Sequence, residues 1–318
     1  MYKLGIDLGG TNIVAGVVDE NFNIVATAKR KTNCPRPADE ILDDMAAVAL
    51  EAVEAAGLKK EDIEAAGVGS PGAIDPVNGV VCFSNNLEFY NVPMAEMLKE
   101  RTGFDFYLEN DANAAAYGEY VAGAGKGTNN FMMITLGTGV GGGIIIDGKL
   151  YSGSNYAGAE LGHVVISMDG EMCSCGRQGC WEAYASATAL IRQTKAKMEE
   201  NKDSVMWEIA GGDIEKVNGR TAWDASRKGD KAATEVVEKY CRYVGEGVLD
   251  MMNIFEPELI CIGGGISNEK ENLSRPVNDF VNTYRYTRFS DPGDKVCIAA
   301  LGNDAGIIGA AFLDQLYK

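Results

Sequence analysis

The sequence predicts an α/β protein built from two similar domains that face a cleft. Its 318 residues exceed the ~250–300 residues that one hydrophobic core usually supports. Apolar residues make up 46% of the chain and charged residues 24%, which is typical of a folded protein and excludes a disordered one. Each half opens with a strand, a Gly-Thr turn and a second strand. This weak internal repeat suggests duplicated α/β domains.

The first half alternates strand and helix patterns. Three closely spaced apolar runs predict an antiparallel meander, and the helical spacing that follows ends at Gly57. An Ala-rich helix closes this half. In chain order, the predicted elements are strands 3–8, 13–18 and 24–31, helix 38–56, strand 65–69, helix 94–101, strand 104–108 and helix 112–122.

The second half repeats the pattern from residue 131 onward. Asp147-Gly148 is a hairpin signal, and three glycines follow the later strand 259–262. The predicted elements of this half are strands 131–136 and 141–146, helices 183–201 and 231–255, strand 259–262, helix 277–284, strand 296–300 and helix 305–317.

Charge and cysteine usage limit the partners and the compartment. The net charge of −17 repels phosphate backbones and anionic lipid, so we expect no nucleic acid or membrane partner. No segment approaches the ~18 apolar residues of a membrane span, and Asp7 interrupts any signal-peptide pattern. We therefore expect a cytoplasmic protein, in which disulfides are rare. Five scattered cysteines are predicted to be buried small hydrophobic residues: Cys34, Cys82, Cys241, Cys261 and Cys297.

Two glycine turns are candidates for binding phosphate. A Gly-Thr turn between strands can aim several N–H groups at one point, and glycine lets a phosphate oxygen approach the backbone. One such turn alone is equally well a plain hairpin, but two of them could grip one polyphosphate from both sides. Asp7 precedes the first turn, where it suits Mg²⁺ between itself and a phosphate; the alternative is a turn-capping Asp. The turns are Gly9-Gly10-Thr11-Asn12 and Gly137-Thr138-Gly139.

The second turn also carries the spacing of a dinucleotide fingerprint, Gly137-x-Gly139-x-Gly141. That fingerprint requires a helix directly afterwards. Here a strand and a hairpin follow, which argues against a nicotinamide-dependent dehydrogenase.

A histidine and three cysteines predict a metal site. Cys173, Cys175 and Cys180 lie within eight residues, and His163 is the one histidine of the chain. Three thiolates and an imidazole are typical of a closed, structural zinc site, with a disulfide or unrelated core thiols as alternatives. If one ring nitrogen of His163 binds zinc, the other can hold a hydroxyl group in a fixed direction.

Three carboxylates are candidates for binding or catalysis. Asp111 follows a predicted strand, where α/β sheets place their ligand crevice, so it is a candidate general base; a helix N-cap is the alternative for its segment. Glu160 and Glu182 bracket the predicted metal site, although exposed glutamates on a solvated face are also common. Carboxylates and an oriented imidazole in one pocket suit a polyhydroxy ligand.

Taken in order, these motifs resemble those of the ROK sugar kinases (repressor, open reading frame, kinase). The resemblance covers almost the whole chain and implies a two-domain actin-like ATPase (ribonuclease H-like) fold with a cleft between the domains. The matching motifs are Asp7-Leu8-Gly9-Gly10-Thr11, Gly69-Ser70-Pro71-Gly72, Glu109-Asn110-Asp111-Ala112-Asn113, Leu136-Gly137-Thr138-Gly139-Val140-Gly141, Glu160-Leu161-Gly162-His163, Cys173-Ser174-Cys175-Gly176-Arg177-Gln178-Gly179-Cys180-Trp181-Glu182 and Gly263-Gly264-Gly265.

The resemblance implies roles for individual residues. Asp111 matches the catalytic base, which takes a proton from the primary hydroxyl of the sugar. The implied sugar ligands are Asn86, Asn110, Glu160, His163 and Glu182. The implied Mg²⁺ and ATP phosphate ligands are Asp7, Gly9, Gly10, Thr11, Asn12, Gly137, Thr138 and Gly139, with Gly264 and Gly265 beside adenosine. The implied domains are 1–115 plus 302–318, closed by the C-terminal helix, and 116–301, which carries the zinc loop; a homodimer is also implied.

Among ROK kinases the resemblance is greatest to bacterial glucokinases, which implies ATP-dependent phosphorylation of glucose at its 6-hydroxyl, a step of carbohydrate metabolism and glycolysis. A kinase for fructose or N-acetylmannosamine is the nearest alternative, because Glu88-Phe89 stands where such glucokinases often carry Gly-Trp. A sugar-responsive regulator is a second alternative, but repressors carry ~60–80 residues of DNA-binding domain before the first phosphate turn. A non-catalytic sugar-binding protein is a third.

Overall fold

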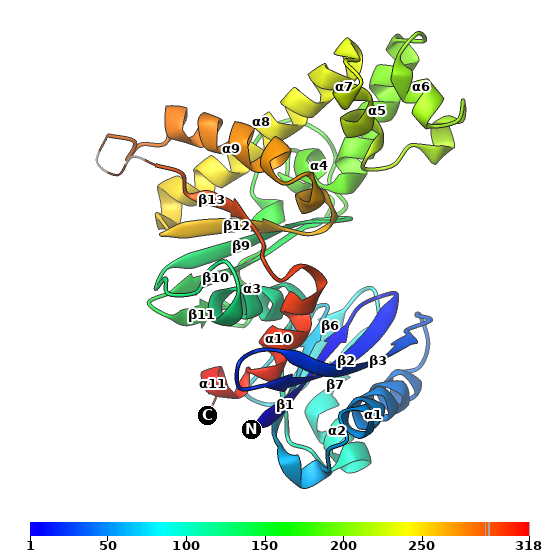
Figure 1. The fold of residues 1–318 in the computed structure, drawn as a ribbon, viewed down its shortest axis with the longest axis vertical. Coiled ribbons are helices and arrows are strands. Elements are labelled where there is room, and N and C mark those ends of the chain that lie inside the picture. The colour runs from blue at the N-terminus through cyan, green and yellow to red at the C-terminus, as the bar shows by residue number, and fades with distance from the viewer. Residues whose placement is uncertain (290, 292, 318) are drawn as a thin grey trace. The chain divides into compact units, whose positions relative to one another are not determined.

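The computed structural model describes residues 1–289, 291 and 293–317 (Figure 1). The chain forms two compact units. Unit 1 comprises Met1–Met133, Gly143–Ala159 and Ala300–Lys318, and unit 2 comprises Ile134–Gly142 and Glu160–Ala299. The helix that follows strand 106–110 lies in unit 1, so the structural division falls further along the chain than residue 115.

The first sheet is built on the predicted meander. Strands β1 (Tyr2–Leu8), β2 (Asn12–Asp19) and β3 (Ile24–Lys31) pair antiparallel. Strands β4 (Ile63–Ser70) and β8 (Phe106–Asn110) extend the sheet beside β1 and run parallel to it. The order across the sheet is β3-β2-β1-β4-β8. Strand β8 begins two residues after the predicted start, because the chain is still tied to the end of the preceding helix there. Gly103 ends that helix at φ 74°, and the Thr102 hydroxyl accepts a hydrogen bond from the backbone amide of Phe104. The carboxyl ends of β1 and β8 carry Asp7 and Asn110.

Helices of unit 1 cover this sheet with apolar faces. They are α1 (Ala38–Ala55), α2 (Met94–Thr102) and α3 (Asp111–Ala122), with the short 3₁₀ helix η1 (Lys60–Asp62). Ile41, Leu42 and Met45 of α1 are fully buried in a cluster with Leu4 and Ile6 of β1. Their spacing on one helical face explains why the sequence pattern predicted α1 almost to its last residue.

A second, three-stranded sheet was not predicted. It consists of β5 (Ala73–Asp75), β6 (Val80–Ser84) and β7 (Phe89–Val92) in that order. The strands are short, and only part of each faces the core: Val81 and Phe89 are buried, whereas Phe83 and Tyr90 are exposed. Such runs are too short for a period to be recognised in sequence. The turn between β6 and β7 carries Asn86.

The chain ends against β1, β4 and α3 within unit 1. The predicted helix 305–317 is two helices, α10 (Ala305–Ala311) and α11 (Asp314–Tyr317), preceded by η5 (Gly302–Asp304). A Cβ atom on Gly5 or Gly67 would lie 2.0 Å from a backbone carbonyl oxygen of α10. Glycine at these positions therefore lets the helix backbone lie directly on the sheet.

The second five-stranded sheet repeats the topology of the first. Its strands are β9 (Phe131–Leu136), β10 (Val140–Ile146), β11 (Lys149–Tyr151), β12 (Leu259–Gly263) and β13 (Val296–Ile298), in the order β11-β10-β9-β12-β13. Strands β10 and β11 pair antiparallel, and β12 and β13 pair parallel. A meander followed by parallel crossover strands thus occurs twice, which confirms the repeat seen in sequence.

Unit 2 contains most of the helices. They are η2 (Leu161–His163), α4 (Glu182–Ala185), α5 (Ala187–Glu200), α6 (Val205–Ile209), η3 (Ile214–Lys216), α7 (Thr221–Arg227), α8 (Lys231–Phe255), η4 (Gly265–Glu269) and α9 (Glu271–Tyr284). The predicted helix 183–201 is divided at Ser186, whose hydroxyl caps α5 by accepting the amide of Ala189. Helix α9 begins at residue 271 rather than at the predicted residue 277, and it contains Pro276.

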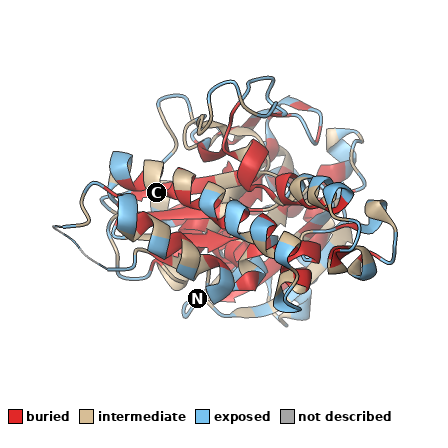
Figure 2. Cartoon of the chain, turned by 90° about the horizontal axis from the view of Figure 1, so that it is seen from above, coloured by how far each residue is buried: buried red, intermediate tan, exposed pale blue. Residues whose placement is uncertain are grey.

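Burial follows the strands, which are largely red in Figure 2, while the exposed residues lie mainly on helices and loops. Among the five scattered cysteines, Cys241 and Cys261 are buried as predicted. The prediction was wrong for Cys82, which is exposed on short strand β6, and Cys34 and Cys297 are only partly buried. Within the described residues, no helix is long and apolar enough to cross a membrane.

Candidate functional site

The turn Gly9-Gly10-Thr11 is held by its carbonyl groups. The Thr32 hydroxyl donates to Gly9 O at 2.6 Å, and the Cys34 thiol donates to Gly10 O at 2.8 Å. In a trans peptide the N–H points opposite to the C=O. The N–H groups of Gly10 and Thr11 therefore point away from Thr32 and Cys34, which is compatible with a phosphate-binding turn.

The turn Gly137-Thr138-Gly139 in unit 2 is held in the same way. Ala187 N donates to Gly137 O at 2.8 Å, and the Thr188 hydroxyl donates to Thr138 O at 2.8 Å. The N–H groups of Thr138 and Gly139 consequently point away from the start of α5. In both turns these added bonds hold the carbonyl groups on one side, an arrangement that is compatible with an anion site.

Two carboxylates of unit 1 interact at the carboxyl ends of β1 and β8. Burial, and to a lesser extent the charge of Asp111, raises the pKa of Asp7 from its ordinary value of 3.8 to about 6. Burial also raises the pKa of Asp111, although the backbone amide of Ala112 partly opposes this by donating to its carboxylate at 2.9 Å. A pair of desolvated carboxylates is suited to hold a divalent cation and to accept a proton.

Asn110 is the N-cap of α3. A helix cap was the alternative to a catalytic role for this segment. The Oδ1 atom of Asn110 accepts the amides of Ala112 at 2.9 Å and Asn113 at 3.3 Å, and its Nδ2 donates to Gly72 O at 3.1 Å. Asp111 is the first residue of α3, beyond the cap. Its carboxylate is therefore not the N-cap that the alternative interpretation required.

A buried glutamate supports this segment and was not singled out from the sequence. Glu109 is 2% exposed, and its Oε1 accepts the Asn110 amide at 2.7 Å and the Asn113 side chain at 3.0 Å. The Tyr317 hydroxyl of α11 donates to its other oxygen. Sequence could not reveal this role, because Tyr317 is 208 residues away in the chain.

His163, Cys173, Cys175 and Cys180 gather in unit 2 as predicted. Their ligand atoms all lie within 4.8 Å of one another. The Cys173 Sγ to His163 Nδ1 and Cys175 Sγ to Cys180 Sγ distances are both 3.7 Å. Tetrahedral zinc with ~2.3 Å bonds to sulfur places its ligands roughly 3.5–3.8 Å apart, so the donor set fits such an ion. The sulfur atoms are too far apart for a disulfide, which needs ~2.05 Å.

Glu182 lies beside this cluster. Its Oε1 is 3.6 Å from Cys173 Sγ and accepts the Ser174 hydroxyl at 3.0 Å, while its Oε2 accepts the amide of Val140 at 3.0 Å. Glu160 is exposed, and its carbonyl accepts the amide of His163 at 3.1 Å. The cysteine loop therefore brings Glu182 next to the His163 cluster, while Glu160 lies one turn before His163.

The loop that carries Asn86 explains one departure from the family's pattern. Asn86 is exposed between β6 and β7. Glu88 is exposed at φ 55°, a left-handed conformation that favours glycine, and Phe89 is 1% exposed. The Gly-Trp pair of many glucokinases suits this backbone and core position, and Glu88-Phe89 occupies it with a polar side chain directed to solvent.

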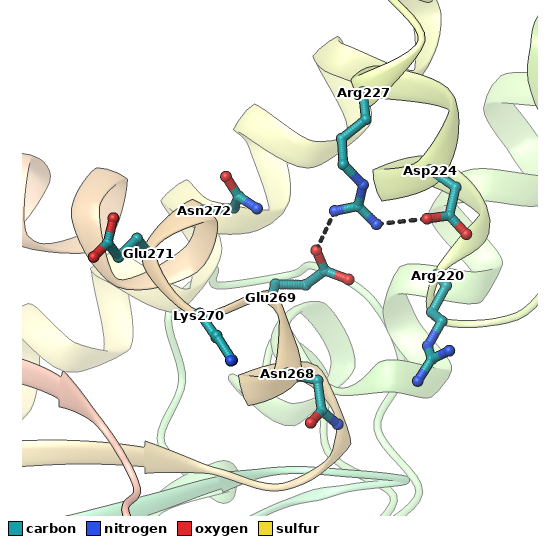
Figure 3. Close-up of a pocket in the computed structure, with 8 residues that line it drawn as sticks. All are labelled: Arg220, Asp224, Arg227, Asn268, Glu269, Lys270, Glu271 and Asn272. Carbon is teal, nitrogen blue, oxygen red and sulfur yellow. Dashed lines mark hydrogen bonds and ion pairs between the residues drawn. The ribbon is translucent and has the colours of Figure 1, made fainter.

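The glycines after β12 lead into η4, whose last residues line a cavity that the sequence did not reveal. Gly264 has φ 82°, and a Cβ there would lie 2.5 Å from Leu136 O, so glycine is required. The cavity measures about 570 Å³ and is lined by Arg220, Asp224, Arg227, Asn268, Glu269, Lys270, Glu271 and Asn272. Figure 3 shows Arg227 between Glu269 and Asp224, at 2.5 Å from each. These side chains come from α7, from Arg220 directly before it, and from the η4–α9 junction, about 40 residues further along the chain.

Comparison with known proteins decides the family. The ROK family profile matches residues 3–316. The chain belongs to the ROK family. It is 39% identical to a glucokinase from Streptomyces coelicolor over 98% of this chain and 96% of that protein. The crystal structure of a ROK glucokinase from Streptomyces griseus with glucose and AMPPNP is 37% identical, with a TM-score of 0.84 over 98% of this chain and 99% of that one.

ROK proteins of another class are less similar. A xylose repressor from Bacillus subtilis is 27% identical, and this chain covers 79% of its length. The similarity to a ROK glucokinase structure also confirms the actin-like ATPase fold expected from the motifs.

Proposed function

We propose that this ROK protein is a glucokinase, which transfers the γ-phosphoryl group of ATP to the 6-hydroxyl of glucose. The observation that carries the assignment is the full-length similarity to glucokinases, including one solved with glucose and an ATP analogue. Within the chain, two phosphate-type turns and the Asp7–Asp111 pair supply the groups that such a transfer needs.

Asp111 acts as the general base. It accepts the proton of the sugar hydroxyl as the oxygen attacks the γ-phosphorus atom. Asn110 supplies the helix cap and Glu109 fixes the Asn110 amide, so the Asp111 carboxylate does neither. Its raised pKa places the base closer to neutral pH, which favours proton transfer.

In this proposal, side-chain amides, carboxylates and an imidazole form hydrogen bonds with the hydroxyl groups of the sugar. We assign this role to Asn86 and Asn110 of unit 1 and to Glu160, His163 and Glu182 of unit 2. In support, His163 faces Cys173 through Nδ1, which leaves Nε2 for a sugar hydroxyl. Asn110 retains one Nδ2 hydrogen, because its Oδ1 already accepts two amides and its Nδ2 donates once.

ATP and Mg²⁺ are assigned to the glycine turns and Asp7. The turns at Gly9–Asn12 and Gly137–Gly139 bind the phosphates through backbone N–H groups, and Asp7 holds Mg²⁺ directly or through its water. Gly264 and Gly265 lie beside adenosine, for which the cavity lined by Arg220 and Asn268 provides space.

The Cys₃His cluster would hold structural zinc. All four donors come from the protein, so no position is left for water and the ion would fix the loop rather than act as a Lewis acid. Thiols stay reduced in the cytosol, so the free cysteines of this cluster are consistent with the cytoplasmic location that we propose. Association as a homodimer stays a prediction.

The direct test combines the protein with glucose, ATP and Mg²⁺ and couples the product to glucose-6-phosphate dehydrogenase. We expect stoichiometric reduction of its nicotinamide cofactor, because only the 6-phosphate is a substrate of the coupling enzyme. ADP release without that reduction would contradict transfer to the 6-hydroxyl. A regulator without kinase activity would give neither signal.

A further inference from the structure

Glu182 lies between the cysteine loop and the glycine turn of unit 2. Its Oε2 accepts the Val140 amide at 3.0 Å, directly after the turn, and its Oε1 accepts the Ser174 hydroxyl at 3.0 Å, directly after Cys173. One carboxylate is therefore bonded to both loops. The sugar-ligand role does not explain either bond, since both partners belong to the protein.

The turn is shaped to receive this carboxylate. A Cβ atom on Gly139 would lie 2.4 Å from Glu182 Oε2, so any side chain there would displace the glutamate. The hydrogen bond to Val140 is charge-assisted and fixes the backbone at the end of the turn. Gly139 thus provides space for Glu182 in addition to exposing its N–H group.

The same segment holds the turn at three successive places. Glu182 binds Val140 N, Ala187 N binds Gly137 O, and the Thr188 hydroxyl binds Thr138 O. The segment begins at Cys180, one of the four clustered metal-ligand candidates, and Ala183 N donates to Cys180 O at 3.0 Å. Residues 180–188 therefore run from the cysteine cluster to the phosphate turn without interruption.

We propose that Glu182 is a positioning residue for the phosphate-binding turn Gly137–Gly139, and that the cysteine loop holds Glu182 in place through Ser174. The inference rests on the proposed function, because it assigns ATP phosphates to this turn. It predicts that nucleotide affinity depends on Glu182 even when no sugar is present, and that it also depends on the order of the cysteine loop.

The test is the dissociation constant of Mg²⁺–AMPPNP measured by calorimetry in the absence of sugar. Glu182→Ala should raise it by about tenfold, the order expected for loss of one charge-assisted hydrogen bond. Glu182→Gln should stay within about threefold of the native protein, because the amide oxygen still accepts the Val140 N–H. Glu160→Ala is the matched control, because Glu160 is also assigned to the sugar. Its side chain is exposed and, among the described residues, forms no hydrogen bond to the turn. The dissociation constant of Mg²⁺–AMPPNP should therefore not change in this variant.

Two further variants leave Glu182 itself unchanged. Ser174→Ala removes the hydrogen bond between the cysteine loop and Glu182, and Thr188→Val removes the hydrogen bond between the start of α5 and the turn. Ser174→Ala and Thr188→Val should each raise the constant by roughly two- to fivefold, because Ser174 acts on the turn only indirectly through Glu182, and Thr188→Val removes one neutral hydrogen bond to Thr138 O. Zinc content, measured alongside, should stay at the native level in both. An unchanged constant in Glu182→Ala would overturn the positioning role, and an unchanged constant in Ser174→Ala would overturn the link to the cysteine loop. Native protein that fails to bind AMPPNP would instead contradict the proposed function itself.

Discussion

At the scale of single residues, the ligand-free protein holds two carboxyl groups, Asp7 and Asp111, where burial makes their ionisation unfavourable. Asp7 and Asp111 are partly buried, and burial together with the charge of Asp111 raises the pKa of Asp7 to about 6. A group whose pKa is higher in the folded than in the unfolded state favours folding when protonated and opposes it when ionised. The pair therefore costs stability at neutral pH in return for a cation and proton site.

Asp7→Asn should stabilise the ligand-free protein and abolish its activity. A pKa raised from 3.8 to about 6 corresponds to up to about 3 kcal/mol at pH 7.5, and about half of that at pH 5, where the folded carboxyl is mostly protonated. Thermal unfolding of both proteins at the two pH values measures this. A variant that is less stable than native at pH 7.5 would contradict the assigned burial of charge.

Asp111→Asn should lower kcat by ~10²–10⁴-fold, the range for a positioned general base. Sugar and nucleotide binding should be retained, because Asn110 rather than Asp111 caps α3. In the native protein, kcat/KM should fall as the pH drops through the raised pKa of Asp111, since the protonated form cannot accept a proton. Near-native kcat in the variant would reduce Asp111 to a structural residue.

At the scale of elements, the predictable parts were those with a local signal. The meander β1–β3, helix α8 and the Cys₃His cluster follow from apolar spacing, glycine turns and ligand spacing within short stretches of sequence. Strands β5–β7 and the Tyr317–Glu109 contact have no local signal, because short strands and pairings across the chain depend on tertiary packing. The break between α4 and α5 could have been found from Ser186, an N-cap residue within the predicted helix.

Loss of one thiolate should remove the metal and the order of the cysteine loop together. Cys175→Ser should reduce zinc from about one ion per chain to near zero, because a hydroxyl is a poor zinc ligand, and glucose binding should be lost with it. Elemental analysis and glucose calorimetry on the same preparation measure both. Active native protein that contains no zinc would contradict the assignment of the cluster.

The contact between α3 and α10 depends on glycine. A Cβ on Gly118 would lie 2.1 Å from the carbonyl oxygen of Ala305, a backbone atom that cannot rotate away. Gly118→Ala should therefore lower the free energy of unfolding by more than about 2 kcal/mol, despite the ~1 kcal/mol by which alanine favours helices over glycine. Gly245→Ala on α8 is the control: the atoms nearest to its methyl group would belong to the Phe280 side chain, the first at 2.7 Å, and a side chain can move more easily than backbone, so the cost should be smaller. Denaturant unfolding of the two variants distinguishes these outcomes.

At the scale of the whole molecule, the chain contains one sheet topology twice, each with a glycine turn between antiparallel strands. Both turns direct consecutive N–H groups by tying down the preceding carbonyls, through side chains in unit 1 and through the start of α5 in unit 2. The repeat was predictable from sequence because each Gly-Thr turn between two strands is a local motif. The roles of the turns and of the candidate base stay predictions. The cavity at the η4–α9 junction was not predictable, because Arg220, Arg227 and Lys270 meet only in the folded unit.

The central claim concerns the sugar, and a hexose panel tests it most directly. Initial rates of ADP release with ATP and Mg²⁺ give kcat/KM for glucose, mannose, fructose and N-acetylmannosamine. We expect glucose to have the highest value, because a displaced 2-hydroxyl or a 2-acetamido group would leave a carboxylate or imidazole of the site poorly paired, and a lost partner costs up to ~10⁴–10⁵-fold. Fructose or N-acetylmannosamine clearly exceeding glucose would contradict the glucokinase assignment while leaving a ROK sugar kinase.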